Sequence, residues 1–176
     1  MASIGIFDKM QNTSGVMYNN ILQVATASSN AISTITDSTT VALGTASFGS
    51  APVSTEGIQL LTLTFQPKYA SSKILLFTSS LDVRETSNVS DEARLSAFAG
   101  STLLGWRTSY FNPSIANNFA YGFHLHCMAN AWGTDSRTVQ LRINQGGGGS
   151  NYQFNNRYTS GWLASEYRMT VMEIQT

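Results

Sequence analysis

Charged side chains are scarce in this chain of 176 residues: they make up 11% of it, against about a quarter in typical soluble domains. Ten basic and ten acidic residues cancel to a formal net charge of zero. Nucleic-acid binders usually carry a clustered basic excess, because contacts to phosphate supply most of their affinity. The even balance therefore argues against a nucleic-acid partner. A near-neutral protein is also prone to associate with other proteins.

Cysteine and long apolar runs are scarce as well. Cys127 is the only cysteine, so the chain cannot form an internal disulfide, which agrees with synthesis in a reducing cytoplasm. Residues 1–20 lack the basic start and apolar run of a signal peptide. No apolar run approaches the ~20 residues that span a bilayer. We therefore expect a protein that is made in the cytoplasm and has no membrane partner.

Serine, threonine, asparagine and glutamine take the place of the missing charge. Helix surfaces usually carry Glu and Lys, so this balance argues against a helical protein. Short bursts of alternating apolar and polar residues, separated by turn residues, are typical of a sandwich or barrel. We predict an all-β fold: an antiparallel, jelly-roll-like β-sandwich of eight to ten strands over residues 21–176, preceded by a short extended N-terminal arm.

The alternation predicts strands over most of the chain after the arm. The clearest is at residues 58–65, and Pro67 ends it. Residues 93–99 and 102–108 flank Gly100-Ser101, a pair typical of a tight hairpin turn. The remaining predicted strands are residues 21–25, 40–43, 73–83, 118–132, 138–144, 152–155 and 167–174.

Residues 1–20 differ from the rest, with a small apolar cluster of Ile4, Ile6 and Phe7 ahead of a polar run. One interpretation is a frayed terminus, since termini become ordered mainly when something holds them. The other is an arm whose apolar cluster docks on a neighbouring subunit. Both interpretations stay open on the sequence alone.

The sequence offers little for catalysis. It has no Gly-x-Ser-x-Gly elbow, and no acidic residue lies near its two histidines in sequence. The carboxylates that occur close together, Asp91 with Glu92 and Asp82 with Glu85, lie at predicted strand ends, where solvated charge is ordinary. We therefore expect no enzymatic activity and no cofactor.

The histidines form the most chemically suggestive group. In a strand, His124 and His126 share one face while Leu125 and Cys127 share the other. Two imidazoles are too few for a stable metal site, so we predict none and interpret the pair as polar residues on the less buried face. The alternative is a trimer, in which three chains would offer six imidazoles on the threefold axis.

Aromatic residues make up 11% of the chain, and most are expected to fill the core. Large aromatics on a surface can instead line a sugar-binding groove or anchor a protein interface. The candidates for such exposed contacts are Trp106, Trp132 and Trp162, and the last has the most polar surroundings.

Two motifs stand out, Ser71-Ser72-Lys73-Ile74-Leu75 after a proline and the closing Thr170-Val171-Met172-Glu173-Ile174. Weaker matches occur at residues 21–24, 98–105 and 139–150. In this order the segments resemble a β-sandwich domain of structural proteins from tailed phages, especially cyanophages. The resemblance covers about residues 21–174. It implies a virion component made in the host cytoplasm, with a homotrimer as its usual state.

The resemblance leaves two virion functions open. A receptor-binding fibre normally has a long shaft or attachment module before its tip, whereas this chain has about twenty residues there. We therefore predict a trimeric capsid decoration (cement) protein, whose arm binds the major capsid protein or another virion protein noncovalently and so stabilises the head. The alternative is a tail or head fibre tip that recognises host-surface carbohydrate, which would require exposed aromatics.

Overall fold

The computed structural model describes residues 4–5, 21–31, 33–35, 51–79, 81–85, 91–111, 121–145, 152–154 and 166–175. Within these ranges the secondary structure is all β, as predicted, and no helix could cross a membrane. The strands are β1 (Ile4–Gly5), β2 (Ile21–Ser29), β3 (Ser33–Ile35), β4 (Ile58–Phe65), β5 (Lys73–Thr78), β6 (Leu81–Glu85), β7 (Asp91–Ala99), β8 (Thr102–Phe111), β9 (Tyr121–Phe123), β10 (His126–Asn130), β11 (Arg137–Gln145), β12 (Tyr152–Phe154) and β13 (Tyr167–Ile174).

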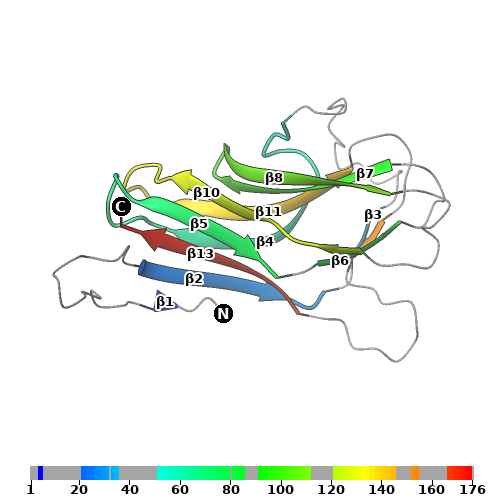
Figure 1. The fold of residues 1–176 in the computed structure, drawn as a ribbon, viewed down its shortest axis with the longest axis horizontal. Helices are drawn as coiled ribbons and strands as arrows, with labels where there is room; N and C mark the ends of the chain where they lie inside the picture. Colours follow the sequence, from blue (N-terminus) through cyan, green and yellow to red (C-terminus); the bar gives the residue numbers. More distant parts are fainter. Residues whose placement is uncertain are drawn as a thin grey trace, which may run out of the picture.

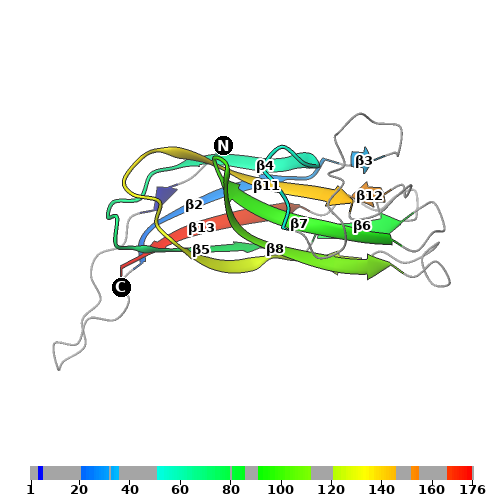
Figure 2. The same cartoon turned by 90° about the horizontal axis from the view of Figure 1, so that it is seen from above.

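Two antiparallel sheets face each other and form a sandwich (Figures 1 and 2). The first has the strand order β1-β2-β13-β5-β10 and the second the order β4-β11-β7-β8. β2 lies near β4 at one edge of the sandwich, and β10 lies near β8 at the other. The last strand therefore lies between β2 and β5, and the chain crosses repeatedly between the sheets. This is the strand order of a jelly roll, which confirms the predicted fold.

A smaller sheet of order β3-β12-β6-β9 lies at one end of the sandwich (Figure 1). Its strands continue four of the long ones: β3 follows β2, β6 follows β5, β9 precedes β10, and β12 follows β11. The described residues form thirteen strands. Without these four and β1, eight strands remain in the body, which agrees with the predicted eight to ten.

Side-chain hydroxyls form hydrogen bonds where β5 ends and β6 begins, two strands that the sequence predicts as one. The backbone N–H of Leu125 donates to Thr78 Oγ1 at 2.9 Å, and the backbone N–H of Arg168 donates to Ser79 Oγ at 2.7 Å. Serine and threonine hydroxyls can replace regular ladder partners in this way. The ladder therefore shifts at this point without leaving these two N–H groups unsatisfied.

Most other predicted strands are confirmed with small changes. β4 and β13 have the predicted bounds, and β2 is longer than predicted. Gly100 has a φ of 61° in the turn between β7 and β8, which confirms the predicted hairpin. The predicted strand 118–132 is described from residue 121 onward and forms β9 and β10, while residues 40–43 lie outside the described part.

The inner faces of the two sheets share one core. On β13 the buried Val171 lies opposite Ala25 of β2 and Leu76 of β5. Fully burying a Val or Leu side chain contributes about 1.5–3 kcal/mol, so these central strands supply much of the apolar burial. The same face of β13 contributes Tyr167 and Met169, as the alternation predicted.

A carboxylate occupies the last inward position of β13. Glu173 is 0% exposed and accepts a hydrogen bond from Gln23 Nε2 at 2.7 Å. Its oxygens also accept from the backbone N–H groups of Lys68 at 2.9 Å and Tyr69 at 3.0 Å. Buried charge is tolerated where it is hydrogen-bonded in this way. Glu173 therefore fastens the connection between β4 and β5 to the final strand.

β7 is buried on both faces. Glu92 is 4% exposed, which corrects the expectation that this strand-end carboxylate is solvated. It accepts a hydrogen bond from Arg94 Nε at 2.6 Å, and Arg94 Nη2 also bonds it. The Arg94 guanidinium lies 5.9 Å from the ring centroid of Trp106. The ion pair and the indole ring together allow two charged side chains to be buried on this face.

Candidate functional site

The outer face of the first sheet carries an apolar row across four strands. Val24 of β2 lies opposite Met172 of β13, which lies opposite Leu75 of β5, which lies opposite Met128 of β10. Met128 is 61% exposed, and the other three side chains are half-buried. We call these four residues the apolar stripe.

The apolar stripe departs from the usual composition of such a sheet. An antiparallel sheet with one face on the core normally presents polar side chains on the other face. Here Phe77, in the next row, extends the apolar surface and packs edge-to-face on His126, with ring centroids 6.3 Å apart. A contiguous exposed apolar patch is typical of an interaction site rather than of a solvated sheet face.

Polar groups border part of the stripe on both sides, while Ile174 lies in the same row as Lys73 and Phe77 lies in the same row as Thr170. On one side Lys73 Nζ donates a hydrogen bond to Asn130 Oδ1, so β5 and β10 are joined at the surface. On the other side lie Thr170, then Arg168 and Ser28. An apolar centre with a polar rim is the composition of protein–protein interfaces. The arrangement suits binding of another protein surface.

The described part of the arm lies at the free edge of this sheet. Ile4 pairs with Ala25 and Gly5 pairs with Val24, so β1 meets one end of the apolar stripe. The other two residues of the predicted apolar cluster, Ile6 and Phe7, lie outside the described residues.

The histidine pair lies at the opposite edge, where β10 meets β8. His124 and Leu125 lie between β9 and β10 and not within a strand, yet the burial agrees with the predicted faces. Leu125 is buried, whereas His126 is exposed and its ring lies 5.1 Å from that of His124. Arg107 Nη1 lies 3.1 Å from His124 Nε2. Because a guanidinium can only donate, this contact assigns Nε2 as the acceptor. Among the described residues no three His, Cys, Asp or Glu side chains could share a metal ion, and the threefold-axis alternative stays a prediction.

Cys127 faces inward beside this pair. A Cβ atom at Gly105 of β8 would overlap the Cys127 side chain, so the absence of a side chain at Gly105 makes room for the thiol. Desolvation by burial raises the pKa of Cys127 to about 11. The group is therefore a protonated thiol near neutral pH, and not an activated nucleophile.

Two of the three predicted aromatic contacts are described, and both have partners within the chain. Trp106 is half-buried and lies under Arg94, as described above. Trp132 is half-buried, packs edge-to-face on Phe65 with centroids 6.1 Å apart, and donates from Nε1 to the carbonyl of Asp135 at 2.9 Å. Trp162 lies outside the described residues.

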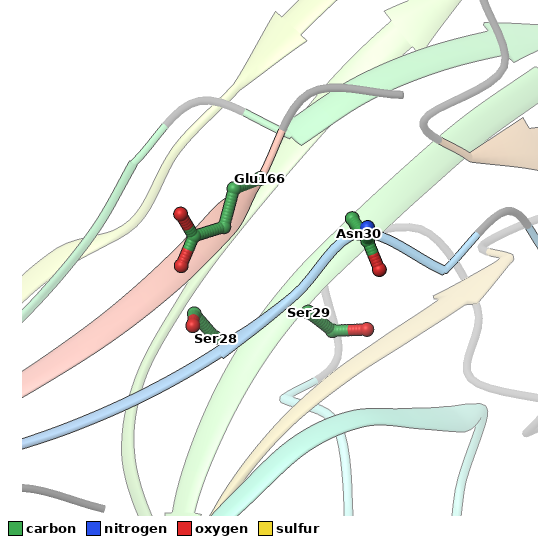
Figure 3. Close-up of a pocket in the computed structure, with 4 residues that line it drawn as sticks. All are labelled: Ser28, Ser29, Asn30 and Glu166. Carbon is green, nitrogen blue, oxygen red and sulfur yellow. The ribbon is translucent and has the colours of Figure 1, made fainter. Parts of the chain in front are cut away.

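A polar pocket of about 320 Å³ lies at the end of β2 and the start of β13 (Figure 3). Ser28, Ser29, Asn30 and Glu166 line it. A hydrogen bond from Ser28 and the nearby Arg168 guanidinium hold the pKa of Glu166 below its ordinary value. A carboxylate, an amide and two hydroxyls can hydrogen-bond the hydroxyl groups of a ligand. No motif in the sequence pointed to this pocket, because Glu166 lies more than 130 positions from the three consecutive residues that complete it.

No known family model matches this chain, and no curated protein matches it. Several solved structures are similar to it. Dimeric latent PorU from Porphyromonas gingivalis aligns with a TM-score of 0.42 and 12% identity, over 67% of this chain and 11% of PorU. The VP2 subviral particle of infectious bursal disease virus aligns with a TM-score of 0.40 and 10% identity, over 86% of this chain and 37% of VP2.

A third similar structure is the C-terminal CBM6 of LamC, a marine laminarinase from Zobellia galactanivorans. It aligns with a TM-score of 0.29 and 12% identity, over 96% of this chain and 90% of that one. The chain thus spans only about a tenth of PorU and about a third of VP2, and nearly the whole of the LamC module.

Proposed function

We propose that this chain is a structural protein of a virus particle, and specifically a capsid decoration protein that stabilises the head. The apolar stripe is the observation that carries the proposal, because it gives a solvated sheet face the composition of an interface. The two motifs that resemble tailed-phage proteins support the same assignment. The partners would be further copies of the chain, as a homotrimer, and the major capsid protein or another virion protein.

The size of the stripe suits repeated weak contacts. Completing the burial of a half-buried side chain contributes about 1 kcal/mol, and burying Met128 contributes about 2 kcal/mol, so the stripe supplies roughly 5 kcal/mol. Association itself costs an estimated ~4–15 kcal/mol. One stripe alone would therefore bind weakly. A closed oligomer on a capsid lattice multiplies such contacts, and multivalency then gives stable decoration.

Binding to capsids tests the proposal. Purified protein would be mixed with capsids of the source virus that lack it, and particles would be sedimented and imaged by electron microscopy. We expect saturable binding at regular lattice positions, and loss of binding when residues 1–20 are deleted. Failure of the intact protein to bind capsids would refute decoration.

A matched pair of substitutions locates the binding surface. Met128→Lys places a charge at the most exposed point of the stripe, whereas Val53→Lys places one at a similarly exposed apolar residue of the segment before β4. We expect Met128→Lys to weaken capsid binding and Val53→Lys to leave it unchanged. Equal effects of the two substitutions would argue against the stripe.

The polar pocket favours a second function, the tip of a fibre that recognises host-surface carbohydrate. Its carboxylate, amide and hydroxyls are the groups that bind sugar hydroxyls, so the pocket would bind sugar without the exposed aromatics that the sequence led us to expect. A glycan array probed with the intact protein and with Glu166→Gln would test it. Selective binding that the substitution abolishes would support the fibre function, and an array without signal would count against it.

A further inference from the structure

β1 pairs with β2 over a small part of the available edge. β2 has nine residues, and its pairing with β1 involves Val24 and Ala25 only (Figure 1). An unpaired strand edge offers backbone N–H and C=O groups to any extended segment. Among the described residues, β1 thus uses only two of the nine positions along this edge of β2.

The register fixes which residues of β2 this pairing uses. Ile4 lies opposite Ala25, and Gly5 lies opposite Val24 of the apolar stripe. Ala25 is buried in the core, whereas Val24 is half-buried on the outer face of the sheet. β1 therefore pairs with β2 at the point where the apolar stripe reaches the edge of the sheet.

Pairing within one chain is poorly supported by the connection. β1 ends at residue 5 and β2 begins at residue 21, so 15 residues join them. Hairpin loops usually have about 2–5 residues, and closing a longer loop costs more entropy. Two paired residues provide little stabilisation to offset this loss of entropy. A connection of this length can extend roughly 50 Å, which is enough to reach the same edge of an adjacent copy.

We propose that β1 is exchanged between copies of the chain, so that Ile4–Gly5 of one copy pairs with β2 of its neighbour in the register seen here. Exchange of an identical element costs little, because the same contacts form within or between chains. It ties each copy to the next through the edge of β2. The inference gives a mode of action to the arm of the proposed decoration protein, but it concerns contacts between copies and needs no capsid.

Engineered cysteines distinguish exchange from pairing within a chain. One copy carries Gly5→Cys and a differently tagged copy carries Val24→Cys, and the two are expressed together. Neither copy can form an engineered disulfide within itself. We expect mild oxidation to give a heterodimer, carrying both tags, that is lost on reduction. The native Cys127 can stay, because its half-buried, protonated thiol reacts slowly.

A register control makes the result specific. Ser28→Cys lies on the same face of β2 as Val24→Cys but four residues away, about 13 Å along the strand. We expect it to give little heterodimer with Gly5→Cys. Equal yields from the two pairs, or no heterodimer from the matched pair, would overturn the exchange.

A single chain carrying both Gly5→Cys and Val24→Cys completes the test. Covalent multimers of this double variant are expected, whereas a disulfide confined to monomers would refute the exchange. Capsid binding is measured separately. If the heterodimer forms but the protein does not bind capsids, the strand exchange stands and the proposed decoration function is refuted. If the protein binds capsids but no heterodimer forms, the decoration function stands and the exchange is refuted.

Discussion

Replacing Glu173 with glutamine removes the charge that fastens the β4–β5 connection to the last strand, with almost no change of shape. The carboxylate accepts from Gln23 Nε2 and from the backbone N–H groups of Lys68 and Tyr69, at 2.7–3.0 Å. Both oxygens take part. An amide has only one acceptor oxygen, so at least one buried donor would face an NH₂ group and lose its partner.

The expected cost follows from these contacts. A hydrogen bond to a charged group contributes about 1.5–3 kcal/mol, and leaving a buried donor unsatisfied costs about 1–3 kcal/mol. Loss of one bond and weakening of the other two gives an estimate of about 3 kcal/mol for Glu173→Gln. For a domain of this size, 1 kcal/mol corresponds to roughly 2–4 °C in Tm. The substitution should therefore lower Tm by about 6–12 °C.

Thermal and urea unfolding of purified protein would measure the effect. Glu166→Gln is the control, because it makes the same chemical change at an exposed carboxylate beside the same strand. We expect the control to unfold close to the wild type, since surface substitutions usually have small effects. If Glu173→Gln unfolded at the temperature of Glu166→Gln, the buried carboxylate would not be stabilising this connection.

Three further predictions concern local features. Gly57→Ala should lower Tm more than Gly133→Ala in the same unfolding assay. Both glycines have positive φ, but a Cβ at Gly57 would overlap a backbone carbonyl of β11, whereas Gly133 faces open space. Equal decreases in Tm would show that the backbone strain of positive φ matters and the overlap at Gly57 does not. The Cys127 thiol, with its pKa raised from 9.0 to about 11, should react with iodoacetamide about a hundredfold more slowly in the native protein than in urea at pH 8, and equal rates would contradict its burial. Ser28→Ala should raise the pKa of Glu166 in an NMR titration. Because the pKa of Glu166 is depressed in the fold, the contribution of this carboxylate to stability is complete above its ordinary pKa and is lost as the pH falls through the folded value. An unchanged titration of Glu166 in Ser28→Ala would show that Ser28 does not lower this pKa.

The body of the fold was predictable because its strands alternate cleanly. β4 and β13 have the predicted bounds: β4 alternates buried and exposed residues and is followed by Pro67, and β13 buries Tyr167, Met169, Val171 and Glu173 on its inward face. The β7–β8 hairpin was predictable for a different reason. Its turn needs positive φ, and Gly100 is the residue there that adopts it without strain.

Features that depend on distant partners were not predictable. The break after Thr78 forms where its hydroxyl bonds Leu125, 47 residues further along the chain. Glu92 looked like an ordinary strand-end carboxylate, but β7 is covered on both faces, and the charge is buried beside Arg94. In both cases the residue type suggested a local role, and the tertiary partner decided the outcome.

The candidate site was only partly within reach of the sequence. The faces of the histidine pair followed from strand alternation and are confirmed. The apolar stripe was missed, although Leu75 and Met172 each lie in a run that is apolar on both faces. Such runs also occur in strands buried on both sides, so the pattern alone did not indicate an interface. The register of four strands was needed to align these residues into one row.

The Ser71–Leu75 motif and the closing Thr170–Ile174 motif lie side by side in the structure, and their contacts show what each contributes to the fold. The closing motif supplies Glu173, whose carboxylate binds the backbone of Lys68 and Tyr69, just before the Ser71–Leu75 motif begins. The same two segments then pair along β5 and β13, with Val171 opposite Leu76. Both motifs thus help to join β5 to β13 in the first sheet, and this structural role does not identify a function. The candidate functional surfaces are instead the apolar stripe, the edge of β2 and the polar pocket. Substitutions at Met128 and Glu166, which lie outside both motifs, should therefore distinguish the proposed decoration from glycan binding while leaving the fold intact.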